Sequence, residues 1–138
     1  ETKKESKSKL ITGTGRRKTA VARVFMYEKK GGFTVNDKDI KDYYDKEIDN
    51  LIWEKPFHVV GVAHPEAKFS ATIKVHGSGN SAQVQAIQLG ISRALAKMDP
   101  EWEILLKKQK LLTRDPRMVE RKKPNLHKAR KATQYSKR

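Results

Sequence analysis

The last 32 residues of the chain carry 13 lysines and arginines against two acids, a net charge of +11. The whole chain carries +15, so the other 106 residues contribute only +4. Because large apolar side chains are scarce in this segment, it cannot bury enough surface to offset the entropy lost on ordering. A basic block of this kind is typical of an interaction tail that binds nucleic acid. A solvated tail without a partner is the alternative, but its self-repulsion then stays uncompensated.

A folded core must therefore form from the residues that precede the tail. The length of 138 residues indicates one domain. We predict three parts: a disordered N-terminal extension over 1–11, a globular α+β RNA-binding domain over 12–106, and the basic tail over 107–138. Removing both charged ends leaves roughly 95 residues, which is enough for one modest core.

The strands are predicted from period-two alternation of apolar and polar residues. Residues 16–27 are predicted to form one strand with two partly apolar faces, which is typical of a central strand. Gly31 and Gly32 indicate a turn, and 33–35 is expected to return as the second strand of a hairpin. The clearest alternation covers 68–76, where Phe, Ala, Ile and Val share one face.

Helical spacing of apolar residues first appears over 40–52. We expect the carboxylates of this stretch to lie on its solvated face. Pro56 should interrupt the helix, because proline lacks the N–H that a helix interior needs. The residues that follow, 57–62, are apolar enough to form another strand.

Two further helices complete the predicted elements. One should begin at an N-cap formed by Asn80 or Ser81, and a short one should follow the Asp99-Pro100 pair. The fold class is therefore α+β: a single small domain with one mixed β-sheet, helices packed mainly on one face, and a long, extended basic C-terminal tail.

The segment Gly13-Thr-Gly-Arg-Arg-Lys18 has the composition of an anion site. Its glycines would let the backbone approach a phosphate closely, and Arg16, Arg17 and Lys18 supply positive charge. The spacing does not match a nucleotide-binding P-loop. A solvated entrance to a strand is the alternative interpretation.

The segment Gly77–Ser81 joins a strand to a helix N-terminus. Unpaired N–H groups and the helix dipole favour an anion there, with Asn80 at the helix start and Gln83 in the first turn. A tight turn followed by a helix cap explains the same residues equally well.

The tail is expected to bind RNA phosphates through its cations. Its first part, 113–123, is long enough for one or two helical turns laid on a surface, and Pro124 should end them. The candidate RNA-binding residues of the tail are Arg114, Arg117, Arg121, Lys122, Lys123, Lys128, Arg130 and Lys131.

The sequence contains no pattern typical of catalysis or metal binding. Cysteine is absent, and the four histidines are scattered without metal-ligand spacing. No serine or carboxylate stands in a nucleophile motif. No apolar run approaches the ~20 residues needed to cross a bilayer. We therefore expect no enzymatic activity, no cofactor, no metal, no small-molecule substrate and no membrane partner.

Several motifs occur together in an order that resembles a known family. They are Gly13-Thr-Gly-Arg-Arg-Lys18, Gly77-Ser-Gly-Asn-Ser-Ala-Gln83, Ala86-Ile87 with Gly90-Ile-Ser-Arg-Ala-Leu95, Thr113-Arg-Asp115 with Glu120-Arg-Lys-Lys123, and Lys128-Ala-Arg130 with Gln134-Tyr-Ser-Lys-Arg138. Over about residues 13–138 the chain resembles bacterial-type small-subunit ribosomal protein nine. It departs from the family's common residues at Ala82, Thr133 and Tyr135.

The resemblance implies a small α+β domain bound to 16S-type ribosomal RNA in the head of the small subunit. It also implies that the tail reaches the anticodon stem-loop of the peptidyl-site tRNA through Ser136, Lys137 and Arg138. The implied partners are ribosomal RNA, that tRNA and neighbouring head proteins. The implied location is the ribosome of the cytoplasm, with an organellar ribosome left open.

Two other classes of function fit the sequence less well. An RNA-modifying or nucleotide-dependent enzyme would use the loop over 77–81, but no acid or nucleophile accompanies it. A DNA-compacting basic protein would seldom need a folded domain with an acidic helix face. The resemblance and the charge distribution both favour a non-enzymatic ribosomal protein.

Overall fold

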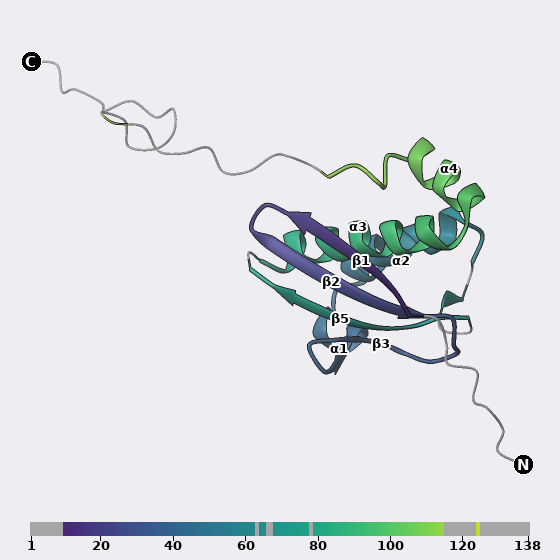
Figure 1. The fold of residues 1–138 in the computed structure, drawn as a ribbon. Coiled ribbons are helices and arrows are strands. Elements are labelled where there is room, and N and C mark those ends of the chain that lie inside the picture. Colours follow the sequence, from purple (N-terminus) through teal and green to yellow (C-terminus); the bar gives the residue numbers. More distant parts are fainter. Residues whose placement is uncertain (1–9, 63, 66–67, 78, 115–123, 125–138) are drawn as a thin grey trace, which may run out of the picture.

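A computed structural model describes residues 10–62, 64–65, 68–77, 79–114 and 124, and the predictions for 1–9 and most of 115–138 lie outside these ranges. The chain forms a sheet with helices stacked against it (Figure 1). The elements are β1 (Leu10–Arg17), β2 (Ala20–Tyr27), β3 (Phe33–Val35), β4 (Lys38–Asp39), α1 (Ile40–Tyr43), α2 (Glu47–Val59), β5 (Ser70–His76), α3 (Asn80–Met98) and α4 (Pro100–Lys108).

The five strands form one mixed sheet in the order β1-β2-β5-β3-β4. All neighbours are antiparallel except β3 and β5, which run parallel. Helix α3 packs across β1 and β2, while α2 and α4 pack against α3 on the same side of the sheet (Figure 1). The predicted fold class, α+β with one mixed sheet and helices mainly on one face, is confirmed.

The prediction of a single strand over 16–27 was wrong, because the chain reverses at Lys18 and Thr19. Arg17 pairs with Ala20, so Lys18 and Thr19 form a tight hairpin turn between β1 and β2. Lys18 adopts a left-handed backbone with φ of 52°. Glycine or asparagine usually marks such a position, so a lysine there carries no turn signal that can be recognised from the sequence.

The predicted hairpin that ends in 33–35 was also wrong. β3 does not pair with β2, because β5 lies between them. β3 instead runs parallel to β5, with Val35 opposite Ile73. Asn36 extends this contact, since its side-chain amide donates to the Val75 carbonyl and accepts from the Val75 N–H.

Helix α2 continues through Pro56, so the predicted interruption and the strand over 57–62 were wrong. Proline leaves the carbonyl four residues earlier, that of Ile52, without its helical donor. The side-chain amide of Gln88 on α3 donates to this carbonyl over 2.9 Å. The helix therefore tolerates proline because a neighbouring helix supplies the missing hydrogen bond.

The buried face of α2 differs from the predicted stripe. Trp53 and Phe57 are fully buried and contact Phe33, whereas Ile48 and Leu51 are exposed. One carboxylate expected on a solvated face, Asp49, is buried instead. The offset arises because α1 ends at Tyr43 and α2 starts afresh at Glu47.

The remaining elements match their predictions closely. In β5 and the residue before it, Phe69, Ala71, Ile73 and Val75 are buried. The Asp99 carboxylate caps α4 by accepting from the Glu101 N–H, and Pro100 is the first helical residue. The N-cap of α3 is Gly79, one residue before the predicted asparagine, and it forms no side-chain cap.

Backbone-to-backbone contact fixes α3 on the sheet. A β-carbon added to Gly15 would lie 1.7 Å from the Ala86 carbonyl oxygen, and one added to Gly13 would lie 2.1 Å from that of Gly90. The close approach that the sequence indicated for these glycines therefore exists, but its partner is a helix of the same chain.

The outer edge of β1 is held by side chains of α3. Arg93 donates to the Thr14 carbonyl over 2.7 Å, and Lys97, one helical turn later, donates to the Thr12 carbonyl over 2.8 Å. Because buried or edge carbonyls need donors, these bonds complete the pairing of a strand that has a neighbour on only one side.

Candidate nucleic-acid interface

The tip of the β1–β2 hairpin and the start of α3 lie at one end of the sheet. Val21 pairs with His76, so the hairpin turn sits beside the turn that leaves β5. Gly77 adopts φ of 84°, and a β-carbon there would be 2.5 Å from the Thr19 carbonyl oxygen. The two segments that the sequence singled out as anion sites are therefore neighbours.

Lys18 and Asn80 are exposed at this end of the sheet, whereas Gln83 is buried. The Gln83 amide donates to the Gly77 carbonyl and accepts from the Tyr44 hydroxyl, both over 3.1 Å. Burial raises the pKa of Tyr44, so this hydroxyl keeps its proton and remains a donor. Gln83 thus holds the turn in place, and its contact with RNA stays a prediction.

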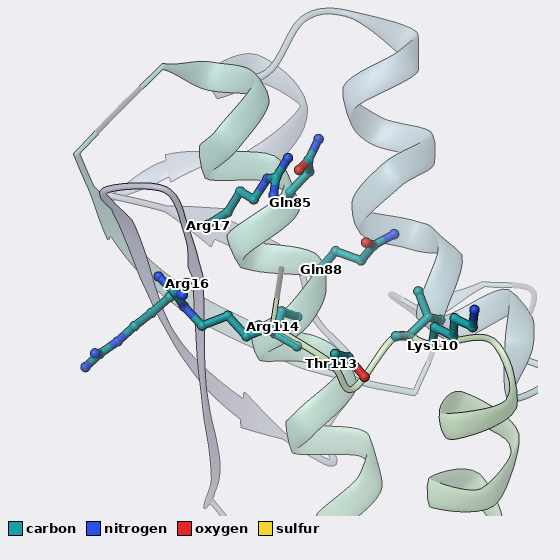
Figure 2. A pocket seen from close by; sticks show the side chains of 9 residues that line it. Arg16, Arg17, Gln85, Gln88, Lys110, Thr113 and Arg114 are labelled. Carbon is teal, nitrogen blue, oxygen red and sulfur yellow. The ribbon is translucent and has the colours of Figure 1, made fainter. Parts of the chain in front are cut away.

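A pocket of about 400 Å³ lies between the end of β1, one face of α3 and the segment that follows α4. Figure 2 shows side chains from these three segments around it. Among the described residues its lining includes four cations and no acid: Arg16, Arg17, Gln85, Gln88, Leu89, Lys110, Leu111, Thr113 and Arg114.

The two arginines of β1 reach the pocket from opposite faces of the strand. Successive strand residues alternate, so Arg16 lies on the outer face and is exposed, while Arg17 lies on the helix side and is half-buried. On that side, Gln85 projects from α3 near the end of the Arg17 side chain (Figure 2).

The end of α4 directs the third segment back to this pocket. Lys110 adopts φ of 58°, its N–H donates to the Lys107 carbonyl, and the Leu111 N–H donates to the Leu106 carbonyl. This pair of bonds is a Schellman motif, which ends a helix and reverses the chain. Leu106 and Leu111 are both buried, and the chain that follows places Thr113 and Arg114 in the pocket beside Gln85 and Gln88 of α3.

The structure brings together three of the residues predicted to bind RNA, Arg16, Arg17 and Arg114. Arg114 follows the other two by nearly a hundred positions in the sequence. It also adds Gln85, Gln88, Lys110 and Thr113, which the sequence analysis missed. Helical spacing of the two glutamines was the only available signal. Lys18, Asn80 and Gln83 are described but are not among the residues that line the pocket. The remaining predicted residues lie outside the described ranges: Arg117, Arg121, Lys122, Lys123, Lys128, Arg130, Lys131, Ser136, Lys137 and Arg138.

Guanidinium, ammonium, amide and hydroxyl groups around one hollow are suited to anionic oxygens. Arginine can offer two parallel hydrogen bonds to a phosphate, and lysine adds a point charge. Among the residues that the structure describes, no group of three histidine or acidic side chains is arranged to hold a metal ion. Within the same ranges, no helix has the length and apolarity needed to cross a membrane.

Comparison with known protein families gives a match over most of the chain. The model of the family described as ribosomal protein S9/S16 matches residues 15–138. The match starts within β1 and includes every segment that lines the pocket.

Proposed function

The chain belongs to the ribosomal protein S9/S16 family, and on that premise we propose that it is a non-enzymatic, structural protein of the small ribosomal subunit that binds 16S-type ribosomal RNA in the subunit head. Its partners are that RNA and neighbouring head proteins. The observation that carries the proposal is the four-cation pocket, because it gathers cations from two segments of the matched region that lie more than ninety positions apart.

The charge distribution supports one orientation on RNA. Asp42, Asp45 and Glu47 are exposed around the start of α2, and none of the three is among the described residues that line the pocket. Carboxylates close to a phosphate backbone repel it. We therefore place the hairpin tip and the pocket against RNA, with the acidic start of α2 facing solvent or a basic protein.

Two variants with equal charge loss test this orientation. Arg17→Gln with Arg114→Gln removes two pocket cations, and Lys46→Gln with Lys55→Gln removes two exposed cations of the α2 region. We expect the first pair to weaken binding to protein-free ribosomal RNA at least tenfold, since hydrogen bonds to charged groups contribute about 1.5–3 kcal/mol each. The second pair should change affinity by less than about twofold.

Fluorescence anisotropy on labelled head-domain RNA measures these affinities, and sedimentation of the wild-type chain with small subunits tests the function itself. Migration apart from the small subunit at moderate salt would overturn the proposed function. Equal losses from the two pairs would overturn the orientation alone.

The proposal extends to the tail, for which the family resemblance is the support. Ser136, Lys137 and Arg138 are assigned to the anticodon stem-loop of the peptidyl-site tRNA. A basic arm of this length reaches roughly 35 Å over its last eleven residues when fully extended. The terminal carboxylate offsets part of the charge, so the contact should be modest.

Deleting Ser136–Arg138 should leave assembly intact and weaken tRNA binding to purified small subunits about tenfold. The loss corresponds to about 1–2 kcal/mol, the contribution of a charge-assisted hydrogen bond. A tRNA-binding titration on reconstituted subunits measures it, with subunit sedimentation as the control for assembly. Unchanged tRNA affinity in normally assembled subunits would leave the terminus without this role.

A further inference from the structure

The sheet face that points away from the helices carries side chains with no assigned role. Alternation places Arg16, Arg23, Phe25, Tyr27 and Lys74 on this open face, because their strand neighbours point into the core. The other residues of β1, β2 and β5 on this face are Leu10, Thr12, Thr14, Val21, Ser70, Thr72 and His76. None of them is acidic.

Two cations lie directly opposite each other at the centre of this face. Arg23 on β2 pairs in register with Lys74 on β5, and both side chains are exposed. Among the described residues neither side chain forms an ion pair or a hydrogen bond. Like charges directly opposite on a sheet destabilise it. An anion bound between them would remove that cost.

The surface beside this pair is hollowed. A depression of about 450 Å³ is lined by Arg23, Lys74, His76 and the β3–β4 turn, which contributes Asn36 and Asp37. Hydrogen bonds between Asn36 and the Val75 backbone fix the wall formed by the turn. Among the described residues that line the hollow, two are cations, Arg23 and Lys74, and one is an acid, Asp37.

An aromatic ring adjoins the cations on the same face. Phe25 is two residues from Arg23 on β2 and pairs with Thr72 of β5, which lines the hollow. It is only half-buried and takes part in none of the ring contacts found within the described ranges. Its ring is therefore available to a flat ligand.

We propose that this open sheet face binds an unpaired stretch of RNA, with a base stacked on Phe25 and adjoining phosphates held by Arg23 and Lys74. Stacking needs a base that is splayed out of a helix, which excludes duplex RNA as the ligand of this face. The inference rests on the proposed function for its partner, but it concerns a surface separate from the helix-side pocket. Arg16, at the edge strand, borders both surfaces.

The test uses a 4-thiouridine-labelled oligouridine of about ten nucleotides and an RNA duplex of similar length. Phe25→Leu should weaken binding of the oligouridine about five- to tenfold and leave duplex binding unchanged, because only the unpaired strand offers bases for stacking. Photo-crosslinking of the wild-type chain should place the thiouridine on the β2 peptide that contains Phe25.

Arg23→Thr with Lys74→Thr should weaken oligouridine binding about tenfold and make its log–log salt slope shallower by about 1.4. The same double variant should raise the melting temperature of the free protein, because the like-charge pair is gone. The charge-matched control, Lys46→Gln with Lys55→Gln, should leave both quantities unchanged.

The open-face site can fail in these experiments while the proposed ribosomal function still holds. Oligouridine affinity that Phe25→Leu leaves unchanged, or crosslinks that avoid β2, would overturn the open-face site even if the chain sediments with the small subunit. If these variants weaken duplex binding and oligouridine binding to the same extent, the loss reflects general charge and not a site for unpaired RNA. That result would also overturn the open-face site. A protein neighbour captured on this face in assembled subunits, with RNA crosslinks elsewhere, would assign the surface to that protein.

Discussion

We expect the affinity of the chain for protein-free ribosomal RNA to fall roughly 4,000-fold between about 50 mM and about 200 mM monovalent salt. The estimate assumes that about eight cations of the hairpin, the pocket and the tail meet phosphates. With a coefficient between those of single-stranded and duplex nucleic acid, eight contacts give a log–log slope of roughly −6. Counterion release is the physical cause, since each phosphate contact frees a condensed cation.

Titrations at five or six salt concentrations, with labelled head-domain RNA and the full chain, measure this slope. The Arg17→Gln and Arg114→Gln variant should have a slope shallower by about 1.5, because two phosphate contacts are lost. A wild-type slope shallower than about −2 would mean that few phosphates are contacted. Neither the tail nor the pocket would then be the main RNA-binding surface.

The second large effect concerns the fold. Gly15→Ala should destabilise the free protein by about 3 kcal/mol, at the upper end of the cost of overpacking a core. The added β-carbon would lie 1.7 Å from the Ala86 carbonyl oxygen and 2.5 Å from the Gly90 nitrogen. Both are helix backbone atoms, so no side chain can move aside. The sheet and α3 would have to separate.

Thermal unfolding followed by circular dichroism measures this effect, and a loss of about 3 kcal/mol corresponds to a fall in Tm of roughly 15 °C for a domain of this size. Gly32→Ala is the matched control, because no atom lies within 4 Å of a β-carbon added there. That variant should be neutral or slightly stabilised. Similar melting temperatures for the two variants would show that the contact between β1 and α3 is not tight.

The elements that the sequence predicted well are those whose signals are local. Alternation over 68–76 gave β5, and the Asp99-Pro100 pair gave the start of α4. The failures depend on partners distant in sequence. Pro56 remains inside α2 because Gln88 donates to the Ile52 carbonyl, which no local rule predicts. Likewise, β3 pairs with β5 rather than with the strand that precedes it.

The residues of the candidate site also fall into those that local sequence predicted and those that only the fold brings to the pocket. Arg16, Arg17 and Arg114 were predicted because each stands in a basic cluster of the sequence. Gln85 was missed, since it has no unusual local context and only the fold brings it beside the arginines. Lys110 lies in the basic tail, but nothing local distinguishes it from the other lysines there. The return of the chain after α4 depends on left-handed Lys110, where a glycine would have signalled the reversal.

The hydrogen bonds from α3 to β1 also affect the protein before it meets RNA. A strand edge with free carbonyls is a template on which a second chain can add a strand and begin to aggregate. Arg93 and Lys97 occupy the Thr14 and Thr12 carbonyls and place two charges along that edge. The opposite edge is β4, which is only two residues long. One edge of the described sheet is obstructed by charged side chains and the other is only two residues long, so the fold offers little free edge on which a second copy could add a strand before the protein binds RNA.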